Sequence, residues 1–176
     1  MKDALESTAA WARETGQEPL PAWDSLPGIP LYMDQVVLYL TDLLAPFQRE
    51  DTPLLTSSMV NNYVKAGAIP RPEKKKYDRR HLSGLTVLCM LKQVLSLQDI
   101  KVLLRDGALA QEQYGLFLQA HHAAMEELTR DLQESLSQGR DPREEALRLA
   151  AEANAKRAAA EQLLLRLGRK DETPGD

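Results

Sequence analysis

The sequence has little of three features that mark particular protein classes: cysteine, long apolar runs and aromatic residues. Cys89 is the one cysteine in 176 residues, so no intramolecular disulfide can form, which is typical of a reducing cytosol. No apolar run approaches the ~20 residues that span a bilayer. The N-terminal MKDALESTAAW lacks a cationic stretch followed by an apolar one, the pattern of a secretory signal. We therefore expect a cytoplasmic protein that does not associate with membranes.

Patterns typical of enzymes are also missing. We find no nucleophile–base arrangement, no Gly-rich loop that would cradle a phosphate, and no pair of carboxylates with a scaffold to hold them. His121 and His122 are adjacent, so on a helix they diverge and cannot chelate one metal ion together. Cys89 lies among apolar residues and is expected to be a small buried hydrophobe. The sequence therefore predicts no catalytic residues, no metal, no cofactor and no enzymatic activity.

The low aromatic content, 5%, leaves a core of Leu, Ala and Val, which favours helices over a sheet. Apolar residues recur at helical spacing through most of the chain. The helices that we predict cover residues 1–14, 31–47, 57–66, 79–94, 97–105, 108–138 and 143–167. A linker rich in Pro and Gly occupies residues 16–30. The fold class is therefore all-α, ending in a long C-terminal helical hairpin or a dimerising coil.

Charge is distributed unevenly along the chain. The whole sequence has a net charge of −4, but residues 56–82 contain seven basic and two acidic residues, which gives +5 and leaves −9 for the remainder. Such an asymmetry indicates a face that binds a polyanion.

The same basic region contains two short elements. Thr56 is a good N-cap for a helix that continues to about Ala66, and Gly67 suits the left-handed conformation that ends a helix. Pro70 and Pro72 then exclude a helix at the start of the next stretch, AIPRPEKKKYD, which predicts a tight basic loop or short hairpin. Asp78 and Ser96 are expected to cap the two helices that follow.

This order of elements resembles the winged helix-turn-helix of MerR-type proteins. The segments that carry the resemblance are TSSMVNNYVKAG (56–67), AIPRPEKKKY (68–77) and LSLQDIKVLL (95–104). The sequence is more similar still to a bacterial family described only as a domain of unknown function and regarded as MerR-like. LYMDQV (31–36), MVNNYVKAGAIPRP (59–72), KKKYDRRHL (74–82) and LKQVLSLQDI (91–100) point to it, and the likeness covers roughly Pro27 to Leu118.

The resemblance implies four parts. They are an N-terminal arm and linker (1–26), a MerR-like helix-turn-helix domain (27–107), a helical dimerisation region (108–168) and a disordered tail (169–176). The sequence departs from the MerR pattern at Asn61, where that family usually has an Arg that contacts phosphate. It also lacks the effector-half cysteines of MerR metal sensors.

We therefore expect a bacterial transcription regulator that binds double-stranded DNA as a homodimer through its C-terminal helices. Residues 56–66 would enter the major groove, and residues 70–80 would contact phosphates. The residues predicted to bind DNA are Ser57, Ser58, Asn61, Asn62, Tyr63, Lys65, Arg71, Lys74, Lys75, Lys76, Tyr77, Arg79 and Arg80. For Tyr63 and Tyr77 we expect a mixed role, in which the ring is half-buried in the core and the hydroxyl can contact a phosphate, with Tyr77 packing under the hairpin. The alternative is a helical protein-interaction module that kept the fold without DNA binding.

Overall fold

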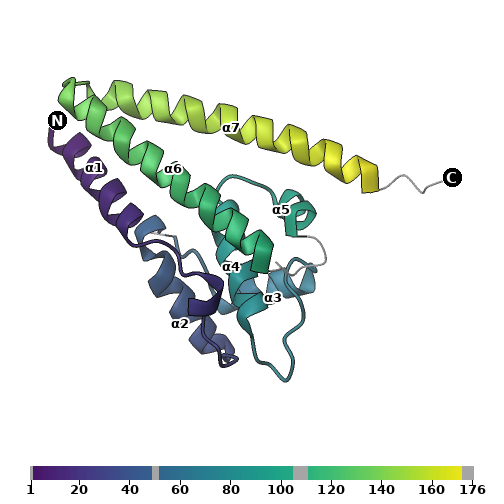
Figure 1. Cartoon of the computed structure of the whole chain (residues 1–176). Coiled ribbons are helices and arrows are strands. Elements are labelled where there is room, and N and C mark those ends of the chain that lie inside the picture. The colour runs from purple at the N-terminus through teal and green to yellow at the C-terminus, as the bar shows by residue number, and fades with distance from the viewer. Residues whose placement is uncertain (1, 49–51, 105–110, 172–176) are drawn as a thin grey trace. The chain divides into compact units, whose positions relative to one another are not determined.

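Helices form the regular secondary structure of the chain. The computed structural model describes residues 2–48, 52–104 and 111–171. Within these ranges there are seven α-helices and no strands, with two short 3-10 helices and isolated β-bridges (Figure 1). The α-helices are α1 (Lys2–Gln17), α2 (Met33–Leu44), α3 (Ser57–Lys65), α4 (Arg79–Leu91), α5 (Leu97–Leu104), α6 (Gln111–Ser137) and α7 (Pro142–Asp171); the 3-10 helices are η1 (Trp23–Ser25) and η2 (Ala45–Phe47). The predicted all-α fold class is confirmed.

The chain divides into two compact units. Met1–Leu20 and Phe117–Ala159 form one, which we call the α1 unit. Pro21–Leu116 and Ala160–Asp176 form the other, the α2–α5 unit. The predicted region 108–168 is therefore divided, because its middle part packs with the N-terminal helix rather than forming a bundle by itself.

The α1 unit is built around an apolar cluster that joins three helices. Leu5, Ala9 and Ala12 of α1 are buried against Leu132 of α6. The partly buried residues packed on this cluster are Leu128, Leu136 and Leu149. Helices α6 and α7 are joined at Gly139, whose φ of +65° ends α6. The predicted hairpin of the two long helices is thus present, and α1 supplies a third helix to its core.

The core of the α2–α5 unit surrounds α4. Every residue of α4 from His81 to Cys89 is buried, as the nearly all-apolar sequence of this helix predicts. Helix α2 contacts both α3 and α4, and α5 packs on α4. Ile69 approaches α4 so closely at Gly84 that an added Cβ there would lie 3.1 Å from its Cδ1. This packing leaves α3 and the loop after it at the surface of the unit.

The three predicted N-caps, Thr56, Asp78 and Ser96, are confirmed. The Thr56 hydroxyl accepts a hydrogen bond from the Met59 N–H at 3.2 Å, and the Asp78 carboxylate accepts one from the Arg80 N–H at 3.0 Å. The Ser96 hydroxyl accepts one from the Asp99 N–H at 3.1 Å. Gly67 has a φ of +71°, the left-handed conformation predicted for it.

Several predicted helix ends were wrong. Helix α1 extends past residue 14 to Gln17, and α4 ends at Leu91 rather than at residue 94. Helix α2 begins two residues after Leu31, because the Leu31 backbone pairs with Tyr77 instead. Helix α7 includes residues 169–171, which were predicted to be disordered. The rest of that tail (172–176), the predicted end of a helix at residue 105 and the predicted start of the long helix at residue 108 lie outside the described residues.

Candidate nucleic-acid interface

Helix α3 presents a polar face whose side chains form no hydrogen bond or ion pair within the described residues. Val60 and Tyr63, with 0% and 7% of their surface exposed, fix the helix to the core. The residues on its outer side are all exposed, and their side chains have neither a hydrogen bond nor an ion pair in the part of the chain described: Ser57, Ser58, Asn61, Asn62 and Lys65. Because hydroxyl and amide groups gain from hydrogen bonds, such a face suits a polar partner.

The loop between α3 and α4 contains a two-residue β-hairpin. The Lys76 N–H donates to the Glu73 carbonyl at 2.9 Å, and the two residues form an antiparallel bridge. Lys74 and Lys75 occupy the tip with φ of +49° and +63°, which is the pattern of a type I′ turn. That turn normally takes Asn-Gly, because L side chains other than Asn and Asp resist positive φ. The predicted basic hairpin is present, and its tip is strained.

Two backbone hydrogen bonds hold the base of this hairpin. Leu31 and Tyr77 each donate to the other's carbonyl at 2.8 Å, which ties the hairpin to the segment before α2. The Tyr77 side chain is only 3% exposed and packs edge-on against His81, with ring centroids 5.4 Å apart. The hairpin therefore projects from an ordered base.

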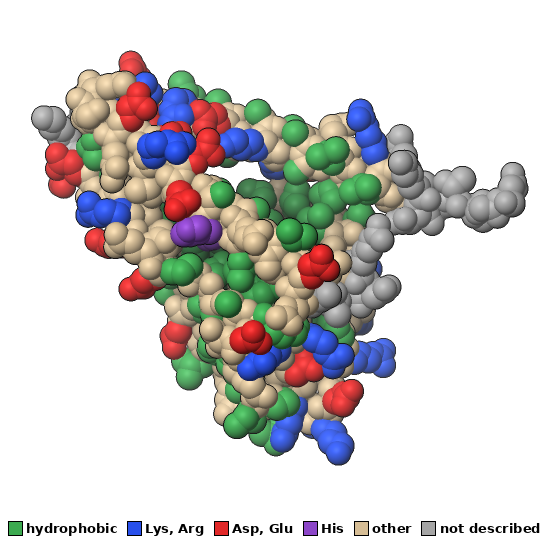
Figure 2. Space-filling view, viewed as in Figure 1, with side chains coloured by type: hydrophobic (Ala, Val, Ile, Leu, Met, Phe, Trp, Pro, Cys, Tyr) green, Lys and Arg blue, Asp and Glu red, His purple; other side chains and the backbone are tan. Residues whose placement is uncertain are grey.

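Basic side chains cluster on the hairpin and are exposed. Figure 2 shows Lys and Arg side chains where this loop projects from the α2–α5 unit. The exposed basic residues of the loop are Arg71, Lys74, Lys75 and Lys76. None of the four has an acidic partner within the described residues.

Tyr32 also belongs to this surface, although the sequence did not indicate it. The Lys76 Nζ lies 5.2 Å from the centre of the Tyr32 ring, a cation–π contact, and Tyr32 is 51% exposed. The contact depends on the pairing of Leu31 with Tyr77, which joins segments more than 40 residues apart. No local sequence signal could have placed Tyr32 beside the lysines.

Arg79 and Arg80 are engaged inside the molecule, unlike the hairpin lysines. Arg79 donates from Nε to the Leu26 carbonyl at 3.1 Å and from Nη2 to the Asp24 carbonyl at 3.2 Å. Arg80 donates to the Asp78 carboxylate, with Nη2 at 2.7 Å from Oδ2. Both were predicted to bind DNA. Their guanidinium groups instead stabilise the start of α4 and the segment before α2.

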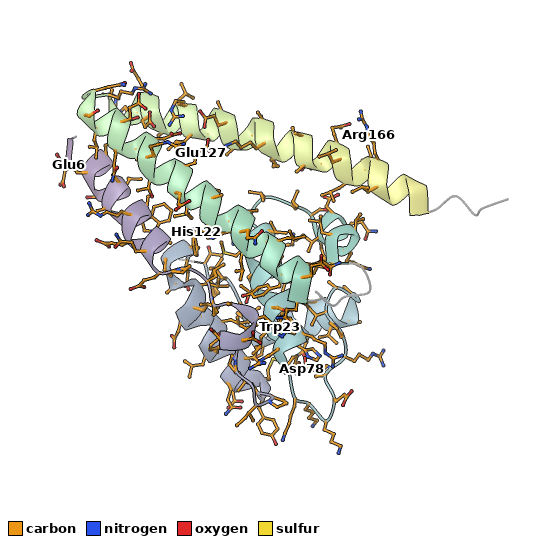
Figure 3. All side chains as sticks on the ribbon, viewed as in Figure 1. Glu6, Trp23, Asp78, His122, Glu127 and Arg166 are labelled. Atoms are coloured by element: carbon orange, nitrogen blue, oxygen red, sulfur yellow. The ribbon has the colours of Figure 1, made fainter. Side chains whose placement is uncertain are left out.

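Asp78 connects the hairpin to α4, and Figure 3 labels it at the first turn of that helix. Partial burial raises the pKa of its carboxyl. Hydrogen bonds from Arg80 and His81 lower the pKa by more than burial raises it, so the pKa is about 2. The His81 Nδ1 lies 2.7 Å from the carboxylate, whereas its Nε2 is buried without a partner among the described residues. Asp78 is therefore ionised at neutral pH and acts as an N-cap.

Tyr63 and Tyr77 are core residues. Burial raises the pKa of both hydroxyl groups. Of their two predicted roles, packing is the one that their exposed fractions of 7% and 3% support. We therefore leave both tyrosines out of the candidate interface.

The described residues offer little other chemistry. Cys89 is 2% exposed, and burial raises the pKa of its thiol to about 12, so it is a buried hydrophobe as predicted. No group of three or more His, Cys, Asp or Glu in the described part of the chain could hold a metal ion. Among the described helices, none has the length and apolarity needed to cross a membrane.

Comparison with known proteins gives a family. The family described as Domain of unknown function (DUF1836) matches residues 21–121, more than half of the chain. This match begins at Pro21, the first residue of the α2–α5 unit, and includes α2 to α5 and the hairpin. Neither the curated proteins nor the solved structures contain a significant match. The chain is thus a member of the family of proteins that carry this domain of unknown function, DUF1836.

Proposed function

We propose that this protein is a bacterial transcription regulator that binds double-stranded DNA through α3 and the hairpin that follows it. The observation that carries the proposal is the combination, in one unit, of a polar helix face and a basic hairpin whose side chains form no ion pair within the described residues. The order of α2, α3, hairpin, α4 and α5 supports a MerR-like winged helix-turn-helix.

Helix α3 has the chemistry of a major-groove reader. Asn61 and Asn62 can each pair with the N6 and N7 atoms of an adenine, and Ser57 and Ser58 can donate to or accept from either base edge. Lys65 lies about one turn after Asn61 and Asn62. A phosphate contact by Lys65 would replace the contact that MerR proteins make with the Arg at the position of Asn61. We infer that this helix favours A·T pairs, because Asn61 and Asn62 match the groups of adenine.

The hairpin supplies cations that would lie along the phosphate backbone. Holding Lys74 and Lys75 at positive φ costs about 1–2 kcal/mol per residue, and such strain tends to persist where function requires it. An Asn-Gly tip would be less strained but would carry no charge. The strain therefore supports a binding role for these lysines.

A homodimer formed by the C-terminal helices completes the proposal. Three leucines of helix α7 are exposed to solvent: the exposed fraction is 72% for Leu147, 62% for Leu163 and 47% for Leu165. Ala151, Ala155 and Ala158 are also exposed, and small residues let two helices approach closely. A two-fold dimer would recognise palindromic half-sites about 34–36 Å apart or a multiple of that distance.

DNA retention across a salt series tests the proposal. The full chain is incubated with genomic fragments, its own promoter included, and the affinity is measured at increasing salt. We expect the variant Lys74→Ala/Lys75→Ala/Lys76→Ala to bind more weakly, with a salt slope reduced by about one for each phosphate that the lysines no longer neutralise. The matched control is Lys92→Ala/Lys101→Ala/Lys156→Ala, which removes the same charge elsewhere and should bind normally.

Two outcomes would count against DNA binding. One is the absence of any retained fragment at low salt, and the other is equal affinity for the hairpin variant and the wild-type chain. Co-purification of a stoichiometric acidic protein, without nucleic acid, would instead favour the protein-interaction module.

A further inference from the structure

A polar hollow of about 580 Å³ lies within the α1 unit, between α1 and α6. Arg13 and Gln17 line it from α1, and the polar residues that line it from α6 are His122, Glu126, Thr129, Arg130 and Gln133. Figure 3 labels His122 along α6. Its volume falls in the range of sites that hold small metabolites, and its surface combines polar side chains with a larger apolar area.

The two arginines that line the hollow have no acidic partner within the described residues. Other arginines of the α1 unit do: Arg140 and Arg148 both contact the Glu145 carboxylate. Glu126 precedes Arg130 by four residues, the spacing and order that favour a helical ion pair. Its carboxylate lies instead 3.4 Å from the Nε2 of His122. Arg13 and Arg130 therefore form no ion pair within the described residues, and their guanidinium groups are available to a ligand.

Gly16 keeps the floor of the hollow open. A Cβ at this position would lie 3.9 Å from both the Met125 Cβ and the Thr129 Oγ1. An alanine would therefore fit in ordinary contact, whereas a longer side chain would project into the space that Gly16 leaves. The Thr129 hydroxyl donates to the Met125 carbonyl at 2.8 Å, so its lone pairs face any ligand as acceptors only.

We propose that this hollow binds a small metabolite through an anionic group, a phosphate or a carboxylate, held by Arg13 and Arg130. Guanidinium groups match the geometry of both anions and form strong charge-assisted hydrogen bonds with them. Gln17 and Gln133 supply amides that can pair with hydroxyl or carbonyl groups elsewhere on the ligand. This site does not depend on the proposed DNA binding, because all its residues belong to the α1 unit.

Calorimetric titration and thermal melting of the full chain test the proposal. Inorganic phosphate and succinate serve as the two probes, with ionic strength kept constant by sodium chloride. We expect saturable binding of at least one probe and a rise in melting temperature that follows its occupancy. Arg13→Gln and Arg130→Gln should each weaken that binding about tenfold or more. The probe that binds distinguishes a phosphorylated ligand from a carboxylate.

Two glycine variants and one arginine variant make the test decisive. Gly16→Ala should fold, melt at a higher temperature and still bind, since alanine favours a helix. Gly16→Leu should abolish binding while circular dichroism shows that the helices remain. Arg143→Gln, which changes an exposed arginine outside the hollow, should leave binding unaltered. No saturable binding of either probe, or equal binding by wild type, Arg13→Gln and Arg130→Gln, would overturn the proposal.

Discussion

The turn between α6 and α7 and the hairpin between α3 and α4 are both rich in charge, but they use it in opposite ways. In the first, Glu145 is 2% exposed, and Arg140 and Arg148 both contact its carboxylate. Arg148 also contacts Asp131 and Glu152. In the hairpin, Lys74 and Lys75 are exposed and form no ion pair within the described residues, although Glu73 precedes them. The first set of charges therefore stabilises the fold, and the second is available to a partner.

Stability measurements should separate the two regions. A charge that is neutralised inside the molecule costs stability when it is removed, because its partners lose their counter-charge. An exposed charge without partners costs almost nothing to remove. Removing it should instead affect binding.

The largest expected effect is at Glu145. We expect Glu145→Gln to lower the free energy of unfolding by about 2 kcal/mol, since two arginines lose a buried counter-charge. Urea denaturation followed by circular dichroism measures this change. Lys75→Gln is the comparison and should stay within about 0.5 kcal/mol of wild type. Equal losses in the two variants would contradict the distinction between paired and available charge.

An intermediate effect of opposite sign is expected at the hairpin tip. Lys74→Asn/Lys75→Gly should raise the free energy of unfolding by about 1 kcal/mol, because Asn-Gly accepts the positive φ of both positions. The same variant should bind DNA more weakly than wild type. Urea denaturation and DNA titration are run on one preparation. A variant that is more stable and binds equally well would show that the lysines have no binding role.

The last expected effect concerns Asp78 and depends on pH. The pKa of its carboxyl in the folded chain, about 2, is below the ordinary value of 3.8. Its ionised form therefore stabilises the fold above about pH 4, and that stabilisation is lost as the pH falls towards 2. Asp78→Ser keeps an N-cap without a titrating group. We expect the melting temperatures of wild type and Asp78→Ser to converge as the pH falls through this window, and a constant difference would contradict the assignment.

The sequence predicted most features that depend on neighbouring residues. The N-caps Thr56, Asp78 and Ser96 each bond to an N–H two or three residues further on, so the residue type and its spacing were sufficient. Gly67 ends α3 for a reason that is equally local, its positive φ. The exposure of Asn61 and Asn62 followed from the period of a single helix.

Features that join distant segments could not be predicted in this way. The sequence grouped Arg79 with the hairpin lysines because they lie within six residues of one another. The guanidinium of Arg79 instead donates to the carbonyls of Asp24 and Leu26, more than 50 positions earlier. The helix that buries Leu132, α1, is also far from it in the chain.

Local residue patterns were enough to specify the helices, their caps and the concentration of positive charge between α3 and α4, because these depend on residues a few positions apart. Which charges remain available depended on the folded chain. Folding paired Arg79 and Arg80 internally, buried Tyr63 and Tyr77, and left Lys74 and Lys75 exposed at a strained tip. For Arg79 long-range packing makes this choice, because its partners lie more than 50 positions earlier, whereas Asp78, the partner of Arg80, is two positions away.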